Sequence, residues 1–121
     1  MNHSFEAYHN NRLIFYSDRN WLHPIFAFEE FLNENTVKTQ ELVVHDKIIG
    51  RAAALLLVRL GVGKIRAKML SELGRQVLEY YAIPYQYEQI VERIGCQTEQ
   101  FLEKELDPEY AYQIILKRIK K

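Results

Sequence analysis

The hydrophobic positions along the chain recur with two different periods, and stretches of the two kinds alternate. Short apolar runs and period-two alternation predict strands, whereas apolar positions three or four residues apart predict helices. The predicted strands lie at residues 13–16, 42–45, 65–69 and from 85 onward, and the predicted helices at 24–33, 50–60, 70–81 and 107–121. Alternation of strands and helices predicts helices packed on a largely parallel sheet.

The expected fold is therefore α/β, a single three-layer domain over residues 1–121 with a mostly parallel or mixed sheet and helices on both faces. Residues 1–11 are polar and are expected to form a loose N-terminal arm. Ser71 is placed to cap the third helix, and Asp107-Pro108 to start the last one. The second helix is apolar on nearly every face, so Ala54, Leu56 and Leu57 are expected in the core.

Composition narrows the classes of protein that fit. The chain has 121 residues, enough for one domain, with 16 Lys and Arg against 16 Asp and Glu. A zero net charge does not favour a specific nucleic-acid binder. The longest apolar run, residues 52–58, is too short to cross a membrane, and residues 1–11 have no signal pattern. Cys96 is the only cysteine, so no internal disulfide can form, and we expect a cytoplasmic protein.

Standard metal and cofactor motifs are missing from the sequence. The four histidines are scattered, and no CxxC pair accompanies them. The sequence contains no phosphate-binding P-loop, dinucleotide-binding GxGxxG or hydrolase GxSxG motif. We therefore expect no metal and no cofactor of these standard kinds.

A candidate binding site lies where strands end beside helix starts, the usual position of ligands in open α/β sheets. The residues expected there are Asp46, Lys47, Gly50, Arg51 and Ser71. Free backbone N–H groups at a helix start, with Arg51 nearby, suit a small polar or anionic ligand, including a nucleotide-like one. Asp46 could act as a general base. The alternative is a tight turn with solvated Asp46 and Lys47.

Cys96 is a second candidate for chemistry. Residues 96–99 could begin a short helix with Thr98 as its cap, and a cysteine near a helix N-terminus can have a lowered pKa. The alternative is a small buried hydrophobic side chain.

The run DKIIGRAAALL at residues 46–56, with Cys96 and Glu99 three residues apart, resembles a prokaryotic family of domains of unknown function. The resemblance implies a cytidine-deaminase-like fold without the zinc-binding motifs. Zinc deaminases place H-x-E and P-C-x-x-C at two helix starts. The corresponding stretches, residues 50–52 and 70–74, contain neither His nor Cys, so a zinc-dependent deaminase is not expected.

These observations favour a ligand-binding or regulatory domain that keeps a deaminase-like pocket without zinc. Two alternatives remain open: an enzyme using non-metal chemistry through Asp46 or Cys96, and a structural or partner-binding protein. By analogy with related folds, and because the chain is rich in aromatic residues, we expect a homodimer.

Overall fold

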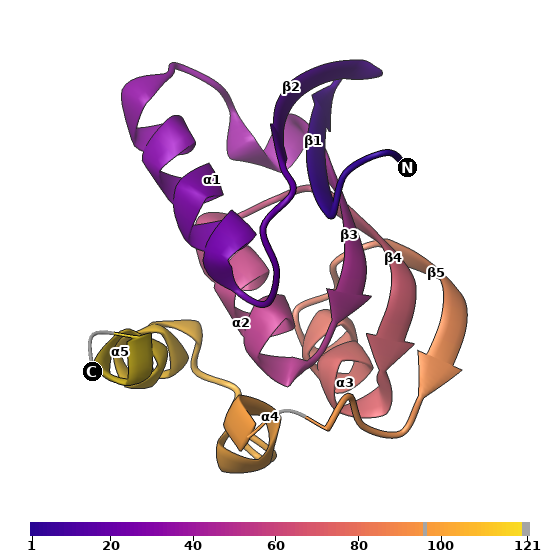
Figure 1. The fold of residues 1–121 in the computed structure, drawn as a ribbon, viewed down its shortest axis with the longest axis vertical. Helices are drawn as coiled ribbons and strands as arrows, with labels where there is room; N and C mark the ends of the chain where they lie inside the picture. The colour runs from indigo at the N-terminus through magenta and orange to yellow at the C-terminus, as the bar shows by residue number, and fades with distance from the viewer. Residues whose placement is uncertain (96, 120–121) are drawn as a thin grey trace.

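One mixed sheet organises the computed structural model of the protein, which describes residues 1–95 and 97–119 (Figure 1). The strands are β1 Phe5–His9, β2 Arg12–Ser17, β3 Leu42–Ile49, β4 Lys64–Ser71 and β5 Tyr85–Val91. The helices are α1 His23–Glu34, α2 Arg51–Leu60, α3 Glu72–Tyr80, α4 Gln97–Phe101 and α5 Pro108–Ile119, with a 3₁₀ turn at Thr39–Glu41. The sheet order is β2-β1-β3-β4-β5, with β1 antiparallel to both neighbours and β3, β4 and β5 parallel. The α/β class and the predicted strands and helices are confirmed.

The N-terminal residues are more ordered than the sequence predicts. The expected loose arm at 1–11 is wrong, because β1 forms there and pairs with both β2 and β3. Asn10 and Asn11 make the tight turn between β1 and β2, with φ of 50° and 66°. This left-handed conformation is one that Asn tolerates better than most residues. Five residues with two buried apolar side chains, Phe5 and Ala7, carry too weak a period-two pattern to reveal the strand.

The predicted end of the second strand is also wrong. β3 continues through Asp46 and Lys47 to Ile49, so the alternative in which these residues form a tight turn does not hold. Gly50 then precedes α2 directly. The pairing of β3 with β4 reaches Ile49, and this tertiary contact extends the strand beyond the apolar run that predicted it.

The helices lie on one face of the sheet, not on both. Ala7, Val44, Ile65 and Tyr85 are successive cross-strand partners and therefore share a face. Both ends of this face meet helices: the ring of Phe28 of α1 lies 5.3 Å from that of Phe5, and Arg75 of α3 donates to the Tyr85 hydroxyl at 2.8 Å. The expectation of helices on both faces is wrong. Right-handed crossovers that step along the sheet in one direction, β3 to β4 to β5, must leave α2 and α3 on the same side.

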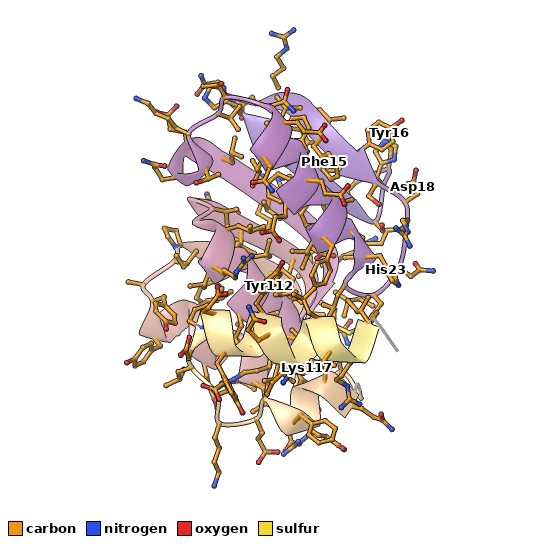
Figure 2. The ribbon with its side chains drawn as sticks, turned by 90° about the vertical axis from the view of Figure 1, so that its left-hand side faces the viewer. Phe15, Tyr16, Asp18, His23, Tyr112 and Lys117 are labelled. Carbon is orange, nitrogen blue, oxygen red and sulfur yellow. The ribbon has the colours of Figure 1, made fainter. Side chains whose placement is uncertain are left out.

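Helix α2 is the centre of the helical layer. Ala54, Leu56 and Leu57 are at most 2% exposed, which confirms the predicted core. Figure 2 shows α5 in the foreground, crossing the outer side of this layer. Tyr112 of α5 packs its ring 3.4 Å from the guanidinium carbon of Arg59 of α2. The last helix therefore completes the core.

The starts of α3 and α5 have the capping residues that the sequence predicts. The Ser71 side chain accepts a hydrogen bond from the Gly74 N–H at 2.9 Å, and Asp107 accepts from the N–H groups of Glu109 and Tyr110. Both predicted caps are confirmed. Thr98 lies inside α4, which begins at Gln97, so it does not precede that helix as a cap.

Candidate ligand pocket

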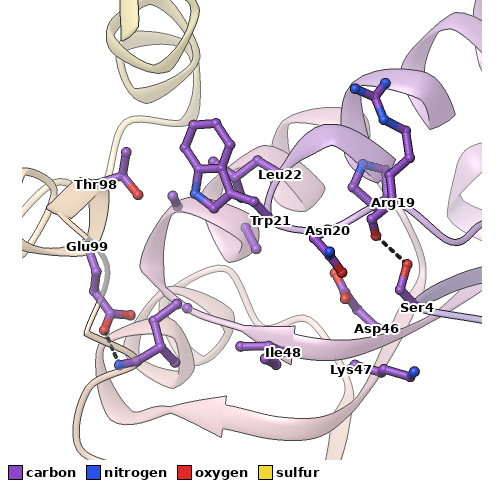
Figure 3. Close-up of a pocket in the computed structure, with 15 residues that line it drawn as sticks. Ser4, Arg19, Asn20, Trp21, Leu22, Asp46, Lys47, Ile48, Thr98 and Glu99 are labelled. Atoms are coloured by element: carbon purple, nitrogen blue, oxygen red, sulfur yellow. Dashed lines mark hydrogen bonds between the residues drawn. The ribbon is translucent and has the colours of Figure 1, made fainter. Parts of the chain in front are cut away.

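A cavity of about 270 Å³ opens beside the end of β3 and the start of α2 (Figure 3). Four parts of the chain build it: the start of β1, the loop that leads into α1, the β3–α2 junction, and the segment around α4. The lining residues are Ser4, Arg19, Asn20, Trp21, Leu22, Pro24, Asp46, Lys47, Ile48, Gly50, Ala52, Ala53, Ile94, Thr98 and Glu99. Seven of these fifteen residues are polar, but most of the exposed surface of the cavity is apolar.

Asp46 is one of the buried polar groups of the pocket. It projects from β3 toward Asn20, and it is only 7% exposed (Figure 3). Burial raises the pKa of Asp46 to about 8, against the opposing effect of hydrogen bonds from the backbone N–H groups of Ile48 and Lys47. At neutral pH this side chain is therefore mostly a neutral carboxylic acid, able to donate one hydrogen bond and accept others.

Trp21 forms an aromatic wall on the opposite side from Ile48 (Figure 3). Its backbone adopts a φ of 61°, which costs about 1–3 kcal/mol in a bulky residue without glycine's freedom. Its side chain nevertheless remains 45% exposed, and Ile48 is 52% exposed. Two large apolar side chains thus face an open cavity, one of them on a strained backbone, and strain of this kind often accompanies binding sites.

The start of α2 is occupied by a side chain of the same protein. Glu99 of α4 is 2% exposed, and its Oε2 accepts hydrogen bonds from the Arg51 backbone N–H at 2.8 Å and the Ser71 hydroxyl at 2.6 Å. Its Oε1 accepts from the Ile94 N–H at 2.8 Å. The carboxylate fills the position at the helix N-terminus where the sequence predicts an external anion.

The Arg51 side chain is engaged inside the protein. Its Nε donates to the carbonyls of Leu102 and Glu105, and its terminal nitrogens to the carbonyls of Leu73 and Glu105 and the side chain of Gln76, at 2.6–3.0 Å. Burial lowers the pKa of Arg51, while Glu105, Glu99 and Glu103 oppose that effect. The guanidinium ties the α4–α5 connection to α3, and it does not reach the pocket.

The predicted site residues are therefore only partly brought together. Asp46, Lys47 and Gly50 line the cavity, whereas Arg51 and Ser71 belong to the neighbouring Glu99 network. The expected cleft between the starts of α2 and α3 is closed, because Gly74 of α3 packs directly on the Gly50 backbone. Cys96, the other candidate for catalysis, lies outside the described residues.

Sequence reasoning missed the apolar half of the pocket. The sequence analysis assigns no role to Trp21 or Ile48, since an aromatic or branched side chain carries no signal of its own surroundings. Glu99 had one signal, its spacing from Cys96, and the structure makes it the anion at the α2 start.

Two further observations concern metal ligands and membrane-spanning helices. Within residues 1–95 and 97–119, no three His, Cys, Asp or Glu side chains converge as a metal site would require. None of the helices in that part of the chain has both the length and the apolar character needed to cross a membrane.

Comparison with known proteins places the chain in a family. The family model described as TM1506, domain of unknown function (DUF1893), matches residues 2–119. The chain belongs to the DUF1893 family. A crystal structure of a DUF1893 family protein (TM1506) from Thermotoga maritima is similar over 95% of this chain and 80% of that one, with a TM-score of 0.82 and 26% identity. No curated protein matches this DUF1893 chain.

Proposed function

We propose that this DUF1893 domain binds a small, polar, planar molecule, of the size of a nucleobase or nucleoside, in the cavity between Trp21 and Ile48. The observation that carries the proposal is the buried Asp46 carboxyl, whose pKa burial raises to about 8, in a cavity whose surface is mostly apolar. A neutral acid offers a donor and an acceptor side by side. The same pairing occurs along the edge of a nitrogen heterocycle, which Trp21 could cover by stacking.

The chemistry of the cavity favours a polar ring over an anion. The Arg51 guanidinium is used by protein carbonyls, and the α2 N-terminus already holds the Glu99 carboxylate. The other cations, Arg19 and Lys47, are exposed at the rim. A phosphate on such a ligand would therefore stay outside, near the rim, while the ring enters. The volume, about 270 Å³, lies just below the range of roughly 300–1,000 Å³ for drug-sized ligands, which suits one or two rings.

The proposal includes a cytidine-deaminase-like layout from which zinc chemistry is missing. Its support is the position of the pocket beside the start of α2, together with the residues at the starts of α2 and α3. Those stretches, residues 50–52 and 70–74, supply Gly, Arg, Ala, Leu, Ser and Glu, and none of the His or Cys ligands of a zinc deaminase.

Trp21 allows a direct test, because it is the only tryptophan in the chain. Its fluorescence, excited where tyrosine does not absorb, reports on this cavity alone. Titration with cytosine, adenine, their nucleosides and inorganic phosphate should give saturable quenching by at least one base or nucleoside and none by phosphate. Binding should weaken as the pH rises through about 8, since ionised Asp46 can no longer donate a hydrogen bond.

Variants connect the signal to Asp46. Asp46→Asn keeps a donor and an acceptor, so it should bind without that pH dependence, and Asp46→Leu should lose at least roughly tenfold in affinity. Glu88→Gln, an exposed carboxyl on β5, is the matched control and should behave as the parent. No quenching by any base or nucleoside, or equal affinity in Asp46→Leu, would overturn the proposal.

A further inference from the structure

The sheet face turned away from the helices carries a continuous polar row. Tyr16, Glu6, His45, Arg66 and Gln86 are successive cross-strand partners from β2 to β5. The helices of the described chain pack on the other face, and Arg66, Lys68 and Gln86 on this one are exposed. Parallel strands such as β3, β4 and β5 are normally covered on both faces. An open face on parallel strands is therefore suited to a partner.

The charge of this face identifies the chemistry of that partner. Lys64, Arg66 and Lys68 alternate along β4. None of these three cations forms an ion pair within the described residues. Alternate residues of a strand lie about 6.6 Å apart on one face, a spacing comparable to that of successive phosphates in an extended nucleic-acid strand. The zero net charge of the whole chain thus conceals a local excess of positive charge.

Acidic groups do not cancel this excess. Glu6 is 3% exposed and accepts a hydrogen bond from the Tyr8 hydroxyl at 3.0 Å. Glu88 of β5 is the other acidic side chain of the strands on this face. The β4 row therefore holds two exposed cations, Arg66 and Lys68, and the half-buried Lys64, beside one exposed carboxylate.

Aromatic rings lie at the β1–β2 end of the same face. The Tyr8 ring lies 4.8 Å from that of His45, and the Tyr16 ring stacks on His3 at 3.9 Å while remaining 54% exposed. Burial, and then the charge of Arg66, lowers the pKa of His45, so that its ring is uncharged at neutral pH. The exposed Tyr16 ring on the same sheet face as a row of cations supplies the two components of sequence-tolerant single-strand binding.

We propose that this open sheet face binds single-stranded nucleic acid, with phosphates along Lys64, Arg66 and Lys68 and a base stacked on Tyr16. A duplex fits less well, because its bases are already stacked and cannot meet the Tyr16 ring. A second copy of the chain fits less well too, since a two-fold axis through this face would bring the cations of β4 against each other. The site is separate from the pocket beneath Trp21 and does not depend on it.

The test is fluorescence anisotropy with a short labelled oligouridylate and the full chain. Single-strand affinity changes with salt by a slope of about −0.7 per phosphate contact, so three contacts predict a slope of about −2 between roughly 50 and 200 mM salt. The variant Lys64→Gln/Arg66→Gln/Lys68→Gln should bind at least about tenfold more weakly, with a shallower slope. Tyr16→Ala should lose roughly fivefold, as for one stacked base.

A matched control variant distinguishes binding at this sheet face from attraction by positive charge elsewhere on the surface. Lys38→Gln/Lys104→Gln/Lys117→Gln removes three exposed cations elsewhere and should bind as the parent does. All substituted side chains lie on the surface, so thermal melting curves should show each variant folded. Absence of binding at 50 mM salt, or an equal loss in the control variant, would overturn the proposal. Equal or tighter binding of oligoglutamate or of duplex DNA would overturn it as well, because a general anion surface would then suffice.

Discussion

The surroundings of Asp46 change its protonation state from the one that is usual for an aspartate. As an aspartate after an apolar strand it invites a role as general base. Its pKa of about 8, caused by burial, makes it a neutral acid at physiological pH instead. The same group can therefore donate a hydrogen bond while it is protonated, and it costs stability once it ionises.

The pH dependence of stability should reveal this cost. Folded Asp46 holds its proton up to about pH 8, whereas the unfolded residue loses it near pH 3.9. The folded state thus binds the extra proton between these values, and the Asp46 contribution to stability is lost as the pH rises through that window. Each pH unit in the window is worth about 1.4 kcal/mol. Asp46→Asn should be more stable than the parent at pH 8, with a smaller difference at pH 5.

Urea denaturation at pH 5, 6.5 and 8 measures this difference. Glu88→Gln, with an exposed side chain, serves as control and should track the parent at every pH. Parallel stability profiles for parent and Asp46→Asn would show that Asp46 ionises normally in the folded protein.

At the scale of elements, α2 is the centre of the helical layer because seven of its ten residues are buried. Leu56→Ala should cost about 2–5 kcal/mol, since Leu56 is 2% exposed and truncation leaves a cavity that the packed helices cannot fill. Leu13→Ala on β2, where the leucine is 41% exposed, should cost less than about 1 kcal/mol. Denaturant titration of the two variants makes the comparison, and similar losses would show that α2 is not central.

Gly74 allows α3 to approach the β3–α2 junction. A Cβ placed on it would lie 2.9 Å from the backbone carbon and oxygen of Gly50, and backbone atoms there cannot move aside cheaply. Gly74→Ala should therefore destabilise the protein by about 1–3 kcal/mol. The gain in helix propensity, at most about 1 kcal/mol, does not offset the clash.

Calorimetric melting of Gly74→Ala beside Gln113→Ala, an exposed substitution on α5, tests this point. The control should remain within about 0.5 kcal/mol of the parent. A Gly74→Ala protein that melts at or above the parent temperature would mean that α2 and α3 are free to separate.

At the scale of the whole molecule, we expect the chain to form a homodimer. Several aromatic side chains on the helical side remain exposed, including Tyr80, Phe101 and Tyr110 at 64%, 66% and 53%. Aromatic residues are enriched in interfaces between subunits. Sedimentation equilibrium at micromolar protein should give twice the chain mass of 14.4 kDa. The Lys64→Gln/Arg66→Gln/Lys68→Gln variant should give the same mass, since the open sheet face is not the expected interface. A species of 14.4 kDa would contradict the prediction.

The sequence by itself determined the elements whose periodicity is long or whose ends have local chemistry. The alternating residues of β4, the apolar run of α2 and the caps at Ser71 and Asp107 act over a few residues, so they can be predicted without knowing the fold. The α/β class follows from them, and so does the choice of the β3–α2 junction as a candidate site.

Tertiary structure decided which groups face one another. The short strand β1 exists because it pairs with β2 and β3, and the helices share one face because successive crossovers have the same hand. Arg51 and Glu99 lie 48 positions apart, and only folding brings that carboxylate to the start of α2 in place of an external anion. The periodicity of apolar residues shows which face of a single helix or strand is buried. A pocket is formed by segments that are distant in sequence, and contacts between such segments produce no local sequence pattern.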